Sequence, residues 1–432
     1  MSTNRIRPLP ENPFYWEYRG KPVVLLGGSV EDNLFQVDGA VDHLDELAAS
    51  GGNYVRCTLS SRDPGNRWPF LKDEGGRYDL EEKDPEYWRR LATFLRDCHE
   101  RDIFVQIELW DRFDYARAPW KDNPLNPENC HEDFATASGL APDYPQHPSK
   151  RENPFFRSIP AFDNNRAVLR VQHRLVDWLL EAALPFPNVL FCVSNETNEP
   201  ERWSSYWADY LARRGHGHAL GRAPVTEMCD PHQLDDPMHE RVWKRPERYA
   251  FVEVSQGNHQ RGSAHYEQLI RMRRRLHIRL LQRPMNAVKV YGADEGPHGS
   301  GRDGIERFWR ALFAGAAAVR FHRPPSGHGL GETAKGHLRA ARSLADRFPF
   351  PHSRPAPELI DPSSRAEAYA MTDARGRSAI LLVSGRRLPL SVPPSGDGIE
   401  WLHCATGEWT PAVSGASLRP PMGEGPFVVV LQ

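Results

Sequence analysis

The stretch NRAVLRVQHRLVDWLLEAALPFPNVLFCVSNE (165–196) shows the pattern that decides the fold. Its first part predicts a helix over 165–183, because apolar residues recur there at helical spacing: Val168, Val171, Leu175, Val176 and Leu179. Its second part, 189–194, is a short apolar run, which is typical of a strand buried on both faces. Helices that alternate with such strands indicate a parallel sheet.

The same unit recurs along the chain. Apolar runs predict strands at 22–27, 53–59, 103–109, 189–194, 224–228, 250–255, 287–291 and 316–321. Helical patterns follow at 39–50, 84–101, 165–183, 201–214, 263–282, 303–315 and 332–348, and only the link 230–248 lacks a clear long helix. Eight units in about 330 residues favour a closed (β/α)₈ barrel over an open doubly wound sheet. A hairpin that turns at Arg19-Gly20 is expected to precede the first strand.

The last part of the chain has a different sequence pattern. Short β-like runs lie at 368–371, 378–384, 390–392, 399–403 and 427–431, separated by turns and without a helical period. They predict a small antiparallel β-sandwich, and HSRPAPELIDP (352–362) is the expected linker. We therefore expect an α/β chain with two domains: a barrel with a long third-strand insert over 1–351, and a sandwich over 352–432.

The composition bounds the class of protein. Hydrophobic residues make up 39% and charged residues 26%, as in a soluble globular protein with an ample core. Lys and Arg (55) nearly balance Asp and Glu (57), so nothing favours nucleic acid or an anionic membrane as a partner. No stretch approaches ~18 consecutive apolar residues, which excludes a membrane protein. The 38 prolines predict many rigid loops on the folded frame.

Two further features concern location and redox state. The segment MSTNRIRPLPENPFYW (1–16) lacks the apolar core of a signal peptide, which predicts a cytoplasmic protein as written. A chain trimmed of its leader would look the same and would be secreted or periplasmic. The six cysteines form no C-x-x-C motif and are expected to be buried free thiols.

Two carboxylates follow predicted strands at the edge where barrel enzymes place their active sites. CVSNETNEP (192–200) puts Glu196 just after the fourth strand, and VYGADEGPHG (290–299) puts Glu295 after the seventh. Hydrolysis of a glycosidic bond needs one carboxylic acid for the leaving oxygen and a second carboxylate to attack carbon one or to activate water. The neighbouring Asn195 is suited to hydrogen-bond a sugar hydroxyl.

These segments resemble the clan A glycoside hydrolases, a cellulase-like (β/α)₈ superfamily. NVLFCVSNE (188–196) resembles the strand-four motif of that clan, which implies that Glu196 is the acid/base. GGNYVRCTL (51–59) resembles its strand-two segment, which implies that Arg56 supports the nucleophile, and the glutamate closing strand seven implies that Glu295 is that nucleophile. WEYRGKPVVLLGGS (16–29), IERFWRALFAGAAAV (305–319) and the C-terminal sandwich resemble apiosidase-like members.

The chain departs from the clan at two strands. Phe321-His322-Arg323 replaces the usual tryptophan after strand eight, and the segment 256–259 replaces the usual tyrosine after strand six. These departures affect the expected sugar contacts more than the two-glutamate chemistry. The side chains near strand ends that we expect to bind substrate are Arg56, Trp110, Asp111, Arg112, Asn195, Asn258, His259, Tyr291, His298 and His322.

Each assignment has a competing interpretation. Glu199 also matches an Asn-Glu-Pro motif, and Asp294 and Glu253 compete with Glu295, although Glu253 is better read as an internal ion-pair partner. Arg56 could be a buried partner for an acidic residue, and the histidines could be ordinary surface or core residues. His216-Gly-His218 has metal-ligand spacing but lies before the fifth strand, so we expect no metal and no cofactor.

The insert at 111–164 is the longest expected loop and is rich in aromatic residues and proline. Aromatic faces stack on sugars, so this loop could wall a carbohydrate cleft, and the alternative is packing on the barrel. Arginines near strand ends (Arg56, Arg62, Arg112, Arg302 and Arg323) would suit a carboxylate or sulfate, which admits an anionic glycan.

The preferred hypothesis is therefore a retaining glycoside hydrolase that acts on a plant, algal or microbial oligo- or polysaccharide, with the two carboxyls roughly 5–5.5 Å apart. A non-catalytic carbohydrate-binding barrel and a metal-dependent hydrolase are the alternatives. The sugar, the linkage and the oligomeric state stay open.

Overall fold

A parallel eight-stranded barrel forms the centre of the molecule. The structure, a computed structural model, describes residues 4–293, 298–391, 398–415 and 417–431. The barrel strands are β4 (Leu25–Gly28), β5 (Tyr54–Thr58), β8 (Phe104–Asp111), β9 (Val189–Asn195), β10 (Val225–Thr226), β11 (Val252–Glu253), β12 (Met285–Val290) and β13 (Ala318–Phe321). They pair in the order β10-β9-β8-β5-β4-β13-β12-β11, and every ladder is parallel. The predicted (β/α)₈ barrel is confirmed.

The barrel closes between its two shortest strands. No ladder joins β10 to β11 in the described part of the chain, but the amide of Ala250 donates to the carbonyl of Val225 (2.9 Å). The Thr226 hydroxyl also donates to the carbonyl of Phe251 (2.8 Å). These two bonds cross the seam that the eighth strand pairing of a closed barrel would otherwise occupy.

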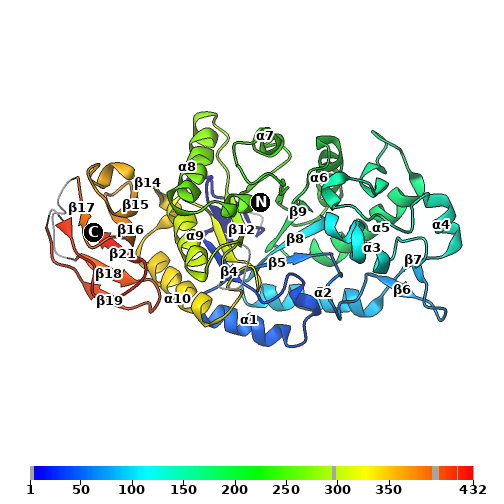
Figure 1. The fold of residues 1–432 in the computed structure, drawn as a ribbon, viewed down its shortest axis with the longest axis horizontal. Coiled ribbons are helices and arrows are strands. Elements are labelled where there is room, and N and C mark those ends of the chain that lie inside the picture. Colours follow the sequence, from blue (N-terminus) through cyan, green and yellow to red (C-terminus); the bar gives the residue numbers. More distant parts are fainter. Residues whose placement is uncertain (1–3, 294–297, 392–397, 416, 432) are drawn as a thin grey trace.

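Helices surround the sheet, as the alternating pattern predicts (Figure 1). They are α1 (Ala40–Ala49), α2 (Pro85–Glu100), α5 (Arg166–Ala183), α6 (Glu201–Gly215), α7 (Pro237–Trp243), α8 (Gly262–Ile278), α9 (Gly301–Phe313) and α10 (Glu332–Arg347). Asp84 caps α2 by accepting from the amide of Tyr87, and Pro85 occupies the first turn, as the Asp-Pro pair predicts. The link without a predicted long helix contains only the short α7.

The N-terminal hairpin closes one end of the barrel. β2 (Trp16–Tyr18) pairs with β3 (Lys21–Val23) across the predicted turn, and β1 (Arg7–Pro8) adds a third strand. The indole of Trp16 donates to Asn286 Oδ1 (3.0 Å) at the start of β12. Gly27 and Gly28 are required by space: a Cβ on Gly27 would lie 1.8 Å from the carbonyl oxygen of Tyr54.

The third-strand insert is more regular than the sequence suggests. It contains α3 (Arg117–Asp122), α4 (Glu132–Ser138) and short 3₁₀ turns, and its aromatic rings pack on one another and on α6. A second unpredicted feature is the hairpin β6 (Phe70–Lys72) and β7 (Tyr78–Lys83), which lies beside α4 and α5 in Figure 1. The insert therefore packs mainly on the barrel. This is the alternative that the sequence left open to a loop that walls a carbohydrate cleft.

The C-terminal domain is antiparallel. Its main sheet has the order β14-β15-β16-β21-β18-β19, and β17 (Leu388–Pro389) pairs with β20 (Ser417–Leu418). The main strands are β14 (Ser353–Pro355), β15 (Glu367–Asp373), β16 (Ser378–Ser384), β18 (Glu400–His403), β19 (Trp409–Pro411) and β21 (Phe427–Leu431). The expected TIM barrel followed by a β domain is confirmed, although β14 already lies within the expected linker.

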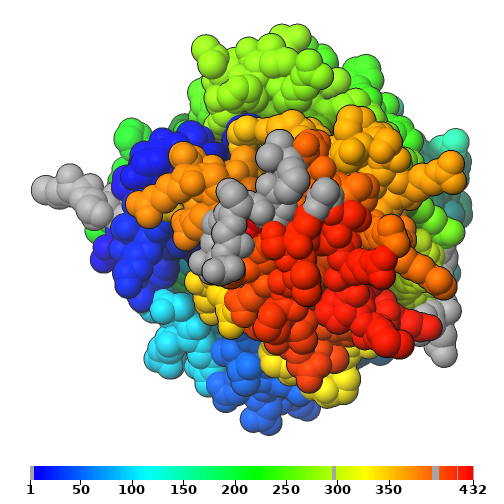
Figure 2. Space-filling model, turned by 90° about the vertical axis from the view of Figure 1, so that its left-hand side faces the viewer, coloured from blue at the N-terminus to red at the C-terminus, as the bar shows by residue number. Residues whose placement is uncertain are grey.

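Both faces of this sheet are buried. Met371, Leu381 and Val428 belong to the same core as the barrel, whereas Ala370, Leu382 and Val429 form a separate core with the β17–β20 side. Because side chains alternate along a strand, burial on both faces explains the continuous apolar run of β16. Figure 2 shows this orange-to-red domain covering one side of the molecule, with the blue N-terminal segment at its edge.

Two remaining expectations concern the thiols and the helices. All six cysteines are free and buried, as predicted. Among the described residues, no helix combines the length and apolarity needed to cross a membrane.

Candidate active site

Glu196 lies at the carboxyl end of β9, directly after Asn195, and its backbone has an unusual conformation. Its φ is +47°, in the left-handed region that non-glycine residues rarely adopt. The next residues hold this conformation, because the amide of Thr197 donates to Met228 (2.8 Å) and its carbonyl accepts from Asp230 (2.9 Å). Such held backbone strain is typical of functional sites.

Two side chains contact the Glu196 carboxylate: Lys289 from β12, and Tyr291 directly after β12. Lys289 Nζ lies 2.6 Å from Glu196 Oε1, and the Tyr291 hydroxyl donates to the same oxygen at 3.0 Å. The Lys289 side chain is 3% exposed and that of Glu196 is 18% exposed. The strand-seven segment therefore meets the strand-four segment at the mouth of the barrel.

A polar chain extends from this pair toward the third strand. Lys289 Nζ also donates to Asn195 Oδ1, and Asn195 Nδ2 donates to Asp111 Oδ2 (3.0 Å). Asp111 accepts in addition from Arg62 Nη1 (2.7 Å) and from the amide of Phe113 (3.0 Å). The structure thus unites Asp111, Asn195 and Glu196 as predicted, but both polar atoms of Asn195 are already engaged.

The electrostatics of the pair favour the charged form of Glu196. Burial by itself would raise the pKa of this carboxyl, but the Lys289 ammonium and the hydrogen bonds from Lys289 and Tyr291 outweigh burial and hold that pKa well below its usual range. Burial and the neighbouring carboxylate raise the pKa of Tyr291, so its phenol stays protonated and donates. Glu196 is an ionised carboxylate in this arrangement.

Arg56 lies deeper in the barrel and is fully paired. Its guanidinium makes two bonds to Glu108, at 2.8 and 2.5 Å, and an ion pair with Asp32. The side chain is 1% exposed, which matches the interpretation as a buried partner of acidic residues. Support of a nucleophile by Arg56 stays a prediction, because Glu295 lies outside the described residues.

Histidines and Tyr291 form an aromatic cluster beside Glu196. His259 stacks on His232 with ring centroids 3.6 Å apart, and His298 lies 4.9 Å from His259 and 4.5 Å from Tyr291. His322 contacts the other side of Tyr291 at 5.0 Å. Burial and the neighbouring His232 and His298 lower the pKa of His259 to about 3, so its imidazole is neutral at neutral pH.

Three predicted substrate contacts occupy other surroundings. Trp110 is 1% exposed and packs against Trp207, Phe155 and Trp203, at centroid distances of 5.0, 5.4 and 6.2 Å. Asn258 is fully buried, donates to the carbonyl of Lys289 (2.8 Å) and accepts from His265 (2.9 Å). Trp110 and Asn258 therefore make internal packing and hydrogen-bond contacts, and their contact with a sugar stays a prediction.

Arg112 is the third of these residues. It is 4% exposed and donates through Nη2 to Asp230 (2.6 Å). Within the described part of the chain, its Nε and Nη1 atoms have no hydrogen-bond partner. Arg112 thus borders the Glu196 environment as a buried cation with spare donors.

The competing carboxylates lie in different environments. Glu199 is buried beside Arg151 and Arg112, and burial raises its pKa to about 7 despite those arginines. Glu253 accepts from the Ser255 amide (2.9 Å) and from Gln106 Nε2 (3.2 Å), so its partners are neutral groups and not the expected cation. Neither Glu295 nor Asp294 falls among the described residues.

Sequence reasoning missed Lys289 and His232. Lys289 lies between two valines in NAVKVYG (286–292), and a single charged residue in an apolar strand is a signal that it faces the polar centre of a barrel. His232 belongs to the link without a clear long helix, where the pattern offers no periodicity to place it.

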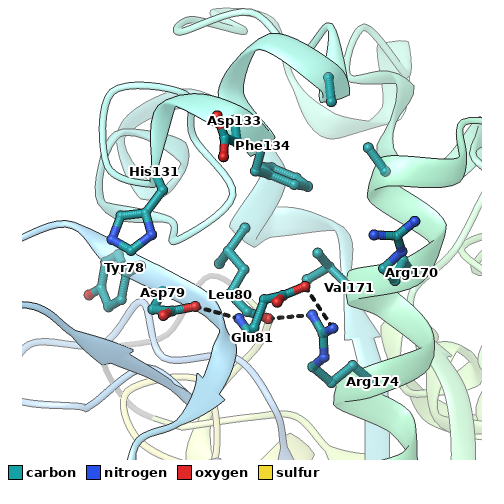
Figure 3. Close-up of a pocket in the computed structure, with 12 residues that line it drawn as sticks. Tyr78, Asp79, Leu80, Glu81, His131, Asp133, Phe134, Arg170, Val171 and Arg174 are labelled. Atoms are coloured by element: carbon teal, nitrogen blue, oxygen red, sulfur yellow. Dashed lines mark hydrogen bonds and ion pairs between the residues drawn. The ribbon is translucent and has the colours of Figure 1, made fainter.

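Two cavities adjoin the insert. One, of about 330 Å³, is lined by Arg62, Trp68, Lys72 and Tyr78 among others, and Arg62 connects it to Asp111. The other, of about 390 Å³, lies between β7, α4 and α5 (Figure 3). There Arg174 donates to Leu80 and Glu81, which ties the hairpin to α5 and indicates a packing junction.

No cluster of three or more His, Cys, Asp or Glu side chains is placed to hold a metal ion, as far as the described ranges extend. The histidines at the mouth contact one another through their ring faces and edges instead.

Comparison with known proteins gives a structural likeness only. No protein-family model and no curated protein sequence matches the chain. A glycoside hydrolase family 5 structure from Bacteroides vulgatus is similar, with a TM-score of 0.65 at 12% identity over 99% of this chain and 93% of that one. A glycoside hydrolase family 5 mannosidase from Rhizomucor miehei has a TM-score of 0.54 at 10% identity, over 80% of this chain and 98% of that one. A maltogenic α-amylase from Thermotoga neapolitana has a TM-score of 0.52 at 12% identity, over 95% of this chain and 98% of that one. The chain therefore shares the fold of these glycoside hydrolase structures, a (β/α)₈ barrel.

Proposed function

We propose that the protein is a retaining glycoside hydrolase that cleaves an O-glycosidic bond in an oligo- or polysaccharide. The observation that carries the proposal is Glu196, held in a left-handed backbone at the carboxyl end of the fourth barrel strand and at the barrel mouth. The similar structures that bear glycosidase names support it at the level of fold, and a fold alone does not specify a reaction.

The proposed mechanism uses two glutamates. Glu295 attacks carbon one of the sugar while Glu196 gives its proton to the leaving oxygen, which forms a glycosyl ester and releases the first product. Glu196, now a carboxylate, removes a proton from water as that water attacks carbon one and displaces Glu295. Asp111 and Asn195 hold the Glu196 segment in place through their hydrogen bonds.

The test is a hydrolysis screen over defined plant, algal and microbial glycans, followed by NMR of the first product formed. The product should keep the anomeric configuration of the substrate. Glu295→Gln and Glu196→Gln should each lower kcat by roughly 10²–10⁴-fold, and Glu196→Gln should spare substrates with good leaving groups. Glu100→Gln, at an exposed site on α2, is the matched control and should keep full activity.

An inverted product would exclude the double displacement. Full activity in both variants would show that the reaction, if any, occurs elsewhere on the chain.

A non-catalytic carbohydrate-binding barrel is the second candidate. Asn195 already uses one N–H with Asp111 and one oxygen lone pair with Lys289, which halves its capacity to bind a sugar hydroxyl and favours this candidate. Glycan binding without hydrolysis in the same screen would support this candidate over the enzyme.

A further inference from the structure

Lys289 is an enclosed cation in direct contact with Glu196. Its side chain is 3% exposed, and its ammonium donates to Glu196 Oε1 (2.6 Å) and to Asn195 Oδ1. The amide of Lys289 is held by Ser255 Oγ (3.0 Å), and its carbonyl accepts from Asn258 (2.8 Å). Lys289 is thus fixed on both its backbone and its side chain, with its charge aimed at one carboxylate oxygen.

The surroundings of Glu196 contain further cationic and polar groups. From β12 and the residue after it come Lys289 and Tyr291, and Arg112 follows β8. His259 lies in the segment after β11 and His298 in the segment before α9. The Glu196 charge acts to raise the pKa of both imidazoles. His232 stacks on His259 from outside. Within the described residues, these neighbours stabilise a negative charge on Glu196 or are neutral toward it.

We propose that Lys289 is a positioning residue that keeps Glu196 ionised in the free protein, so that Glu196 can serve as an acid only after their ion pair opens. Glu196 is the carboxylate that Lys289 contacts directly, and each charge of such an enclosed pair favours the charged form of the other. The second half of the statement rests on the function proposed above, whereas the ionisation of Glu196 does not.

The proton balance follows from this arrangement. The first step of a retaining hydrolase consumes one proton from the acid, and an ionised Glu196 has none to give. Glu196 must therefore take a proton from solvent water, with Lys289 moved to another acceptor, before the glycosidic bond breaks. Asn195 Oδ1, which Lys289 already contacts, is an acceptor that remains for it among the described residues.

The first measurement does not depend on activity. Carboxyl signals of the ¹³C-labelled full chain are followed by NMR from pH 4 to 9, with the Glu196 signal assigned by its loss in Glu196→Gln. In the wild type this signal should not titrate in that range. In Lys289→Met it should titrate inside the range, because removal of the cation leaves burial, which raises the pKa of this carboxyl, less opposed. Lys289→Arg keeps the charge and should match the wild type.

A wild-type Glu196 signal that titrates near the ordinary value of about 4.3 or above would overturn the proposal. This measurement is made on the wild type, so the ionisation of Glu196 is tested even if the Lys289→Met protein does not fold.

Kinetics give the second measurement. In the wild type, kcat/KM should fall about tenfold for each pH unit through neutrality, because only the rare protonated form of Glu196 reacts. In Lys289→Met the fall should begin at higher pH. If kcat/KM of the wild type instead stays constant around pH 7, and Lys289→Met does not change this, the ion pair does not have to open before the reaction.

The two measurements separate this proposal from the proposed function. If Glu196 is ionised but no glycoside is cleaved, the function fails and the Lys289 role stands. If glycosides are cleaved while Glu196 titrates at its ordinary value, the Lys289 role fails and the function stands.

Discussion

At the scale of single residues, two glutamates of the barrel have opposite electrostatic situations. Glu196 has an ammonium at 2.6 Å, which keeps its charge stable. Glu253 accepts hydrogen bonds from Ser255, Gln106 and the β12 backbone, and burial raises its pKa to about 7. The difference depends on Lys289, whose charge points to the mouth and not to the middle of the barrel.

Glu253→Gln should stabilise the protein at high pH. The folded-state pKa of Glu253 lies above the unfolded value of about 4.3, so the unfolded chain binds fewer protons between these pH values and stability is lost as pH rises from 4.3 through 7. The side-chain amide of the Glu253→Gln variant does not titrate, so the variant does not lose stability in this way as the pH rises. We expect the free energy of unfolding at pH 8 to increase by roughly 2–3 kcal/mol, measured by urea titration.

At pH 4 the two proteins should differ little, because Glu253 is then protonated in the folded state. Glu82→Gln, at an exposed site on β7, is the control and should change neither value. Equal effects of Glu253→Gln at pH 4 and pH 8 would contradict a titrating Glu253.

At the scale of elements, the strands were the most predictable part. A strand buried on both faces, such as VLFCVSN of β9, needs a continuous apolar run and shows it in the sequence. The side toward which a residue points at the end of a strand is not encoded in the same way. Trp110 and Asp111 are neighbours in sequence, yet Asp111 bonds to Asn195 while Trp110 packs on α6.

The unpredicted elements share one physical cause. The hairpin β6–β7 includes exposed charged residues on its outer side, and α3 and α4 are only 6 and 7 residues long, so none carries enough apolar periodicity. Their positions depend on contacts distant in sequence, such as Arg174 to Leu80 and Arg77 to Cys130. The location of Glu196 was predictable because it depends only on where β9 ends.

Trp110→Ala should destabilise the junction between β8, α6 and the insert. Loss of this ring leaves a cavity among Trp203, Trp207 and Phe155, and such truncations cost about 3–5 kcal/mol. Urea unfolding would measure the loss, and Trp110→Phe should recover part of it.

Trp68→Ala is the matched control, since Trp68 is half-buried at the edge of a cavity and should cost less. A Trp110→Ala protein with wild-type stability and a raised KM for its glycan would contradict the packing role and restore the predicted sugar contact.

At the scale of the whole molecule, the barrel and the C-terminal sheet share a core. Tyr266 of α8 stacks on Tyr369 of β15 at 3.7 Å, and Arg310 of α9 binds Glu367 (2.7 Å). The indole of Trp409 donates to Ser343 of α10 (2.9 Å). Apolar, ionic and hydrogen-bonded contacts therefore join the two domains, and Figure 1 shows the C-terminal sheet beside α9 and α10.

The two domains should unfold together. Calorimetry of the full chain should show one transition, because separation would expose apolar residues on the inner face of the sheet. Trp409→Ala removes the bond to Ser343 and the stacking of Arg347 over the indole (4.1 Å), and should lower the single Tm by roughly 2 °C or more.

Val413→Ala, at a residue that is 89% exposed, should leave Tm unchanged. Two separate transitions, with only one moved by Trp409→Ala, would show that the domains are thermally independent.

The sheet with two buried faces has a consequence for synthesis on the ribosome. The barrel strands and helices end at Arg347, whereas the central strand β21 follows much later, at Phe427–Leu431. β21 pairs with both β16 and β18, so the sheet cannot be completed until β21 has left the ribosome, well after the last barrel helix. Until then, the nascent barrel presents the outer sides of α9 and α10 without their cover, and this interval is when the chain most needs a chaperone.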